Sequence, residues 1–331
     1  MRIESEISKE RSDIDVSIII NVHNQPLSLK LALRSLMAQD YKGFKEVIVV
    51  DDGSNAGLFS GLHEDFKKAE IPIRYVWQQD KGMRELNSFN NGIKLAKGNY
   101  LIFLAGDMVP NLDFVSKHVK SHIQPKLIVA GNRNWRGLIT PIVFQSLDSK
   151  PIKVVLNNLE HNWQVDELSK KREIGENDKR KMWLGSKHSW KACFACNLSI
   201  PNNPEVMFDE NYFGWGNYDQ ELTYRLSVKH GYTPVYREDI HAYHLESPEA
   251  IANVFRTQKH EDIVNYIKNT FHFFDKCPGL ELEDAFFGFA RLDLDMNTNK
   301  WRVLKNSQIC TKEQLHQKID IARKWLEENK N

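Results

Sequence analysis

The stretch LIFLAGDMVP, residues 101–110, decides the fold, because it reads as a buried strand that ends on a single carboxylate, Asp107. A strand inside a sheet can carry an unbroken apolar run, but an acid at its end must be solvated, paired or bound to a cation. Taken alone, Asp107 fits a solvated loop. The segments around it indicate something more specific.

Strand and helix patterns alternate through the N-terminal third of the chain. The β-branched run VSIIINV at 16–22 precedes apolar residues at helical spacing, where Pro26 suits a first helical turn. The pattern repeats with a strand at 46–54, a helix at about 56–69 and a strand at 73–78. This alternation predicts an α/β fold with a mostly parallel central sheet flanked by helices.

Polar residues follow three of these strands, namely Asn24, Asp51, Asp52 and Asp107. The carboxyl ends of parallel strands meet at one edge of a sheet, and ligands bind beyond that edge. Solvation alone would scatter such residues along the chain. We therefore expect a binding site at this edge.

The rest of the chain is less regular. Residues 132–192 lose the alternation, and the dense charge run KKREIGENDKRKMW at 170–183 is typical of a solvated mobile loop. A strand that carries two histidines is expected at 237–248. Residues 249–331 predict helices and one hairpin, and therefore a mainly helical C-terminal extension.

The composition is that of an ordinary folded protein of 331 residues, 41% of them hydrophobic. Lys and Arg number 45 against 44 Asp and Glu, so the net charge of +1 gives no reason to expect a nucleic acid as partner. No apolar run of about 18 residues predicts a transmembrane segment, and the charged N-terminus does not resemble a signal peptide. We expect a cytoplasmic protein.

Taken together, the segments resemble the family-two glycosyltransferases with the GT-A fold. The matching pieces are VSIIINVHN, VIVVDDGS, KGM…NNGIKLAKG, LIFLAGDMVP and FDENYFGWGNYDQEL, and they cover roughly residues 16–246 in the expected order. The second half is similar to the galactosyltransferase-type region of bacterial chondroitin-type polymerases. The resemblance implies an inverting enzyme that moves a sugar from a UDP-sugar to a hydroxyl of a glycan acceptor, in bacterial surface polysaccharide synthesis.

The resemblance also implies a domain plan. An N-terminal tail at 1–14 precedes a GT-A domain at 15–248, and the helical extension occupies 249–331. The domain consists of a nucleotide half at 15–110 and an acceptor half at 111–248. We also expect peripheral association with the inner face of the membrane. The sequence leaves the oligomeric state open.

Family motifs assign the donor site to Asn21, Asn24, Asp52, Arg84 and Asp107. Asp52 is expected to accept a hydrogen bond from the uracil ring, and Arg84 is expected to meet the diphosphate. These roles agree with the chemistry, because a carboxylate accepts from a pyrimidine N–H and a guanidinium fork matches phosphate oxygens. Asp52 could also be a turn acid before Gly53.

The family pattern Asp-x-Asp is altered here to Ala105, Gly106 and Asp107, so the first acid is missing. The resemblance implies that Asp107 and one histidine of HAYH hold Mn²⁺ or Mg²⁺. His241 and His244 are three residues apart, so in an extended strand they point to opposite faces and at most one is a ligand. The family ligand precedes a polar, proline-bearing loop, which selects His244, and an imidazole ligand favours Mn²⁺.

An inverting transfer needs a carboxylate on the acceptor side to take the hydroxyl proton, and the motif GWGNYDQEL assigns this role to Asp219. Tyr218 replaces a family glutamate, and Glu221 is expected to compensate in acceptor binding. Trp215 is expected to offer a flat platform for a sugar ring. The structural alternatives are a helix-capping role for Asp219 and a core position for Trp215.

Two other functions fit the same sequence. One is a glycosyltransferase that acts on a protein or peptide, because acceptor choice would depend on residues 132–192 and the C-terminal segment. The other is a nucleotide-sugar-binding protein without catalysis, which the departures at Ala105 and Tyr218 motivate.

Overall fold

The computed structural model describes residues 2–7, 14–55, 57–247, 253–304 and 310–329. It divides into two compact units, Met1–Glu210 with Leu222–Ala250 and Asn211–Glu221 with Ile251–Asn331. The predicted boundary between domain and extension, at 248 and 249, lies outside the described residues. Among these residues, no helix combines the length and the apolar character needed to cross a membrane.

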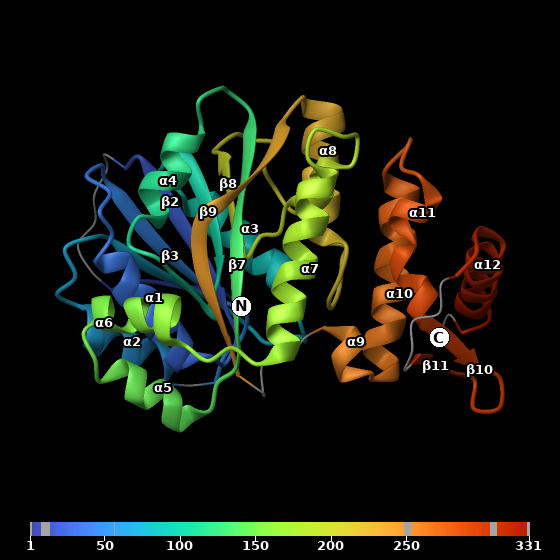
Figure 1. Ribbon diagram of the computed structural model, residues 1–331, viewed down its shortest axis with the longest axis horizontal. Helices are drawn as coiled ribbons and strands as arrows, with labels where there is room; N and C mark the ends of the chain where they lie inside the picture. The colour runs from blue at the N-terminus through green and yellow to red at the C-terminus, as the bar shows by residue number, and fades with distance from the viewer. Residues whose placement is uncertain (1, 8–13, 56, 248–252, 305–309, 330–331) are drawn as a thin grey trace. The chain divides into compact units, whose positions relative to one another are not determined.

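The first unit contains a nine-stranded sheet in the order β1-β4-β3-β2-β5-β8-β7-β9-β6 (Figure 1). Its strands are β1 (Arg2–Glu6), β2 (Val16–Val22), β3 (Lys45–Asp51), β4 (Ile73–Gln78), β5 (Tyr100–Ala105), β6 (Met108–Pro110), β7 (Leu127–Leu138), β8 (Asn197–Pro201) and β9 (Thr233–Glu246). Strands β4, β3, β2 and β5 are parallel, as predicted. Strand β7 is parallel to β9, whereas β1, β8 and β6 pair antiparallel, so the sheet as a whole is mixed. Strand β1 adds an edge strand within the predicted N-terminal tail.

The helices of this unit cover both faces of the sheet. They are α1 (Pro26–Met37), α2 (Leu58–Phe66), α3 (Glu85–Leu95), α4 (Phe114–Ser121), α5 (Pro141–Asp148), α6 (Ile152–Asn157) and α7 (Glu167–Trp183), and α8 (Tyr218–His230) begins in the second unit. Ile18 and Ile20 of β2 share a buried cluster with α1 and α2. Ile19 points the opposite way, and a Cβ on Gly92 of α3 would lie 2.6 Å from it. Strand β2 is apolar throughout because both of its faces are covered.

The charge run at 170–183 is not a loop, which corrects the expectation from the sequence. It lies within the 17-residue helix α7, whose N-cap Asp166 accepts a hydrogen bond from the backbone of Ser169. Ion pairs fix this helix to β7: Glu176 pairs with Arg133 and also lies 2.7 Å from Arg180 of its own helix. A tertiary contact between charged groups, rather than an apolar stripe, positions α7.

A directed chain of buried hydrogen bonds joins α4 to β8. Nδ2 of Asn197 donates to backbone carbonyls of β7 and β9, so its Oδ1 accepts from Nε2 of His118 at 2.9 Å. Nδ1 of His118 then accepts from Ser199, whose Oγ accepts from Nε2 of His122 at 2.8 Å. Burial lowers the pKa of His118 to about 3 and that of His122 to about 4, so both rings are neutral.

These buried histidines predict that the folded state loses stability as the pH falls. Both histidines have an ordinary pKa of 6.5, and the lowered pKa of each in the folded state means that the unfolded chain takes up protons first as the pH falls. Their contribution is complete above about pH 6.5 and is lost toward pH 4, at up to about 1.4 kcal/mol per pH unit for each histidine. Urea unfolding at pH 7 and pH 5 measures this slope. The variant His118→Asn should flatten it, whereas His161→Gln, at an exposed histidine, should leave it unchanged; equal slopes in all three proteins would contradict the assignment.

The second unit is mainly helical, as the sequence predicts. Its elements are α9 (Val254–Thr257), α10 (His260–Lys276), α11 (Leu282–Ala285), the hairpin of β10 (Leu292–Asp295) and β11 (Lys300–Val303), and α12 (Lys312–Glu328). Residues 211–221 pack with it: Asn269 of α10 donates to the carbonyl of Phe213 at 2.9 Å. Gly216 has φ of +113°, and a Cβ there would lie 2.6 Å from the ring of Tyr266, so glycine is required at this turn.

Candidate active site

The strand register brings the predicted polar residues to one edge. Val22 of β2 pairs with Asp51 of β3, and on the other side of β2 Asn21 pairs with Ala105 of β5. Beyond the last pairs, the backbone N–H of Asp52 donates to Val22. Asp52 and Asp107 therefore lie at the same edge of the sheet, on either side of β2.

Asp52 is buried and held from two sides. Its Oδ1 accepts from the side chain of Gln78 and its Oδ2 from the backbone N–H of Arg84, both at 2.6 Å. Burial raises the pKa of Asp52 above its ordinary value, although these donors oppose the shift. Glycine is required at position 53, because its φ is +85° and a Cβ there would lie 2.4 Å from the backbone of Asp80. The carboxylate keeps lone pairs for one further donor, which fits the role expected of it.

Asn24 and Asn21 organise the loops around this edge. Asn24 has φ of +53°, accepts a hydrogen bond from the backbone of Asn55 at 2.9 Å and donates its own N–H to Ser54. The side chain of Asn21 donates to Ser88 on α3. Both amides therefore join strand-end loops to each other or to a helix, in addition to any contact with a ligand.

Arg84 lies directly before α3, on the Asp52 side of the edge. Its Nε donates to Asn87 at 3.2 Å, and Asn87 donates to Glu210 at 2.7 Å. These three side chains line a polar cavity of about 250 Å³, together with Gln78, Gln79, Lys81, Asn91 and Lys94. Positive charge at this cavity suits an anionic or strongly polar ligand.

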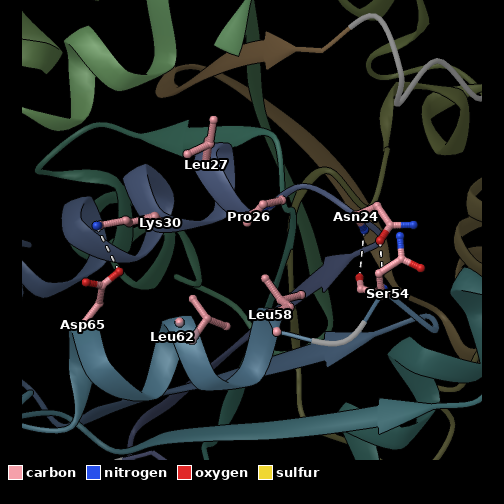
Figure 2. A pocket seen from close by; sticks show the side chains of 11 residues that line it. Asn24, Pro26, Leu27, Lys30, Ser54, Leu58, Leu62 and Asp65 are labelled. Carbon is pink, nitrogen blue, oxygen red and sulfur yellow. Dashed lines mark hydrogen bonds and ion pairs between the residues drawn. The ribbon is translucent and has the colours of Figure 1, made fainter. Parts of the chain in front are cut away.

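A larger cavity, of about 530 Å³, lies between α1 and α2 (Figure 2). Asn24 and Ser54 stand at one end of it, next to the strand edge, and Leu27, Leu58 and Leu62 line its middle. Lys30, at the far end, pairs with Asp65 at 3.0 Å and with Asp148 at 3.1 Å. Since these acids neutralise Lys30, this cavity is less suited to a phosphate than the edge itself.

Asp107 and His244 meet at the edge. Strand β6 pairs with β9 so that Met108 lies opposite His244, and Nε2 of His244 is 3.0 Å from Oδ2 of Asp107. Burial would raise the pKa of Asp107, but His244 and Arg133 outweigh it and hold the pKa below its ordinary value, so Asp107 is a carboxylate. His241 instead bonds to Asn134 at 3.0 Å, away from Asp107.

Two residues of β7 complete this corner, and the sequence analysis did not identify them. The ring of Trp135 lies edge-on to His244 with centroids 4.4 Å apart, and the guanidinium of Arg133 lies 4.7 Å from the centroid of Trp135. Their sequence, GNRNW, lies outside the segments that carry the family resemblance. A useful signal would have been that an arginine on a buried strand requires an acid, here Glu176.

The remaining predicted residues lie in the segment 211–221 of the second unit. Asp219 is in the first turn of α8, where a negative charge interacts favourably with the helix dipole. Trp215 is half-buried, and one face stacks on Tyr266 with centroids 5.8 Å apart. Glu221 is 1% exposed and pairs with Lys276 at 3.0 Å. Such a buried, paired carboxylate is poorly placed to bind an acceptor.

The sequence is similar to those of known glycosyltransferases. The family model "Glycosyl transferase family 2" matches residues 17–175. The match covers just under half of the chain and includes the strand edge with Asp52 and Asp107. It is 29% identical to the hyaluronan synthase of Pasteurella multocida over 261 residues, which are 73% of this chain and 26% of that protein. The chondroitin synthase of Escherichia coli is 25% identical over 70% of this chain and 35% of that protein. The chain thus spans about a quarter to a third of these relatives.

Solved structures agree on the fold. S. aureus TarS superposes with a TM-score of 0.51 at 16% identity, over 82% of this chain and 41% of TarS. GalNAc-T7, solved with UDP, GalNAc and Mn²⁺, superposes with a TM-score of 0.53 at 15% identity, over 80% of this chain and 48% of that one. At such low identity the likeness concerns the fold alone, and the predicted GT-A fold is confirmed.

The ion pairs that hold α7 predict a stability effect. Glu176→Ala should lower the free energy of unfolding by about 3 kcal/mol, because Arg133 and Arg180 lose their shared carboxylate and Arg180 is almost fully buried. Urea denaturation measures this change. Glu167→Ala is the matched control, since this acid of the same helix is 79% exposed and should change stability by less than about 0.5 kcal/mol. Equal effects of the two changes would show that the network is not what positions α7.

Proposed function

We propose that this protein is a metal-dependent inverting glycosyltransferase, which moves a sugar from a UDP-sugar to a hydroxyl of a glycan acceptor in bacterial surface polysaccharide synthesis. The observation that carries the proposal is the Asp107–His244 pair at the strand edge of a family 2 domain. The relatives named as hyaluronan and chondroitin synthases support the choice of a glycan acceptor. Action in the cytoplasm, with peripheral contact at the inner face of the membrane, is part of the same proposal.

In this proposal the donor binds along the edge. Asp52, fixed by Gln78 and by the backbone of Arg84, accepts from the uracil N–H. The guanidinium of Arg84 carries positive charge to the diphosphate, and Asn21 and Asn24 hold the loops that enclose the nucleotide. Each group acts by position, because its hydrogen bonds orient it before the donor arrives.

Asp107, just after β5, and His244 of β9 fit a divalent ion. Two adjacent ligands, each about 2.1 Å from a small octahedral ion, lie about 3.0 Å apart, and this is the separation of Asp107 Oδ2 from His244 Nε2. Nδ1 of His244 is buried with no hydrogen-bond partner among the described residues, so no second bond fixes the proton on that nitrogen. When bound, Mn²⁺ or Mg²⁺ would neutralise charge on the diphosphate.

Asp219 is assigned as the general base from its motif. The acceptor oxygen attacks the anomeric carbon and forms the new glycosidic bond, while its proton passes to the Asp219 carboxylate. The bond between the anomeric carbon and the β-phosphate oxygen breaks, and its electron pair leaves with UDP. Trp215 then has the role of a platform for the acceptor sugar through the face not covered by Tyr266.

The first test is Asp219→Asn. Turnover should fall about a hundredfold to ten-thousandfold, because a general base is lost, while the affinity for UDP stays near that of the parent. Initial rates and calorimetric titration with UDP measure the two quantities. A fall of less than tenfold would move the base to another residue. Failure of the parent protein to turn over or hydrolyse any UDP-sugar would favour the non-catalytic alternative.

The second test concerns the metal. His244→Ala should raise the Mn²⁺ concentration needed for half-maximal UDP binding by tenfold or more, because one of the two protein ligands is lost. His241→Ala is the matched control, since His241 bonds to Asn134 instead of Asp107. The assignment would be contradicted if His241→Ala needed more Mn²⁺ than His244→Ala. It would also be contradicted if a chelator left the affinity for UDP unchanged. We expect Mn²⁺ to activate more strongly than Mg²⁺.

A further inference from the structure

Four arginines gather where α7 meets β7, namely Arg133, Arg136, Arg172 and Arg180. Three of them have a carboxylate partner. Glu176 pairs with two of them, and Glu173 lies 3.6 Å from the third, Arg136. These three have a structural role, because each of them is held by a carboxylate at the joint between helix and strand, with Glu176 shared by two.

Arg172 is different. In the described part of the chain it has no ion pair, and its contact is with an aromatic ring: its Cζ lies 5.6 Å from the centroid of Trp135. A guanidinium that contacts the face of an indole can still donate from its N–H groups to an anion. Among the described residues, the half-buried Arg172 is therefore the arginine of this group without a carboxylate partner.

Its position points to the donor. The same Trp135 ring lies edge-on to His244 at 4.4 Å, and His244 contacts Asp107 at 3.0 Å. Arg172 is thus separated from the Asp107–His244 pair by one aromatic ring. The edge also has one acid fewer than an Asp-x-Asp motif provides, because Ala105 stands in the first position, so an anion near it meets less repulsion.

We propose that Arg172 binds the diphosphate of the donor and stabilises the negative charge that develops on it as the sugar leaves. This rests on the proposed function, because it takes a nucleoside diphosphate as the ligand of the edge. A guanidinium suits the task, since its planar fork can bind two phosphate oxygens and it stays charged at all relevant pH values. Charge placed where it develops in the transition state lowers the barrier.

The test compares two ligands on one protein. Arg172→Ala should weaken the binding of UDP about tenfold to a hundredfold and leave the binding of uridine within twofold, because uridine lacks the phosphates. Arg172→Lys, which keeps the charge but loses the fork, should fall between the parent and the alanine variant. Lys171→Ala is the matched control, since it removes the same charge from the adjacent exposed position and should leave UDP binding unchanged.

Calorimetric titration of the full chain in the presence of Mn²⁺ measures all four proteins. Unchanged UDP affinity in Arg172→Ala would overturn the assignment, and so would an equal loss for UDP and uridine, which would mean that the site had merely been distorted. Failure of the parent to bind UDP would overturn the proposed function as well. If the parent binds UDP and Arg172→Ala binds it equally well, only the role of Arg172 is overturned.

Discussion

The pairing of β6 with β9 is the constraint on which the candidate site depends. Met108 lies opposite His244, and the N–H of Leu245 donates to the carbonyl of Asp107 at 2.8 Å. Side chains alternate along a strand, so a slip of one residue would turn His244 to the other face and leave Asp107 without it. Because β6 is a three-residue strand at the edge of the described sheet, its register depends on β9, and β7 holds β9 from the other side. The sheet therefore fixes the site more than the loops do.

The charges around Asp107 keep it ionised although the first acid of the Asp-x-Asp motif is missing. A carboxylate with little exposure is costly unless its surroundings compensate for the lost water, and here His244 and Arg133 lower the pKa of Asp107. Arg133 in turn pairs with Glu176 of α7, a carboxylate that it shares with Arg180. A divalent ion at this site would have one carboxylate ligand, Asp107, and few other ligands from the protein. Its affinity should then depend on the phosphates that it shares with the nucleotide.

The sequence predicted the parallel part of the sheet well, because strands such as β2 are buried on both faces and read as unbroken apolar runs. It also predicted which residues would reach the edge, since the end of a strand fixes where the next polar residue lies. It was wrong about α7, because the apolar pattern of that segment is weak and its helix is fixed by ion pairs with β7 that are distant in sequence. Arg133 and Trp135 were missed for the same reason, as their importance comes from neighbours on β9 and α7.

The two parts of the proposed site are linked by the chain itself. Hydrogen bonds run without interruption from Asp52 through Arg84 and Asn87 to Glu210, the last residue before segment 211–221, which carries Asp219. Asn90 adds a second hold on Glu210 at 3.0 Å. A carboxylate held by two amides of one helix has little freedom, so the point at which the segment leaves the first unit is fixed by α3. Since Arg84 stands at the start of that helix, the proposed donor site shares these hydrogen bonds with Glu210, from which the chain continues to the proposed base Asp219.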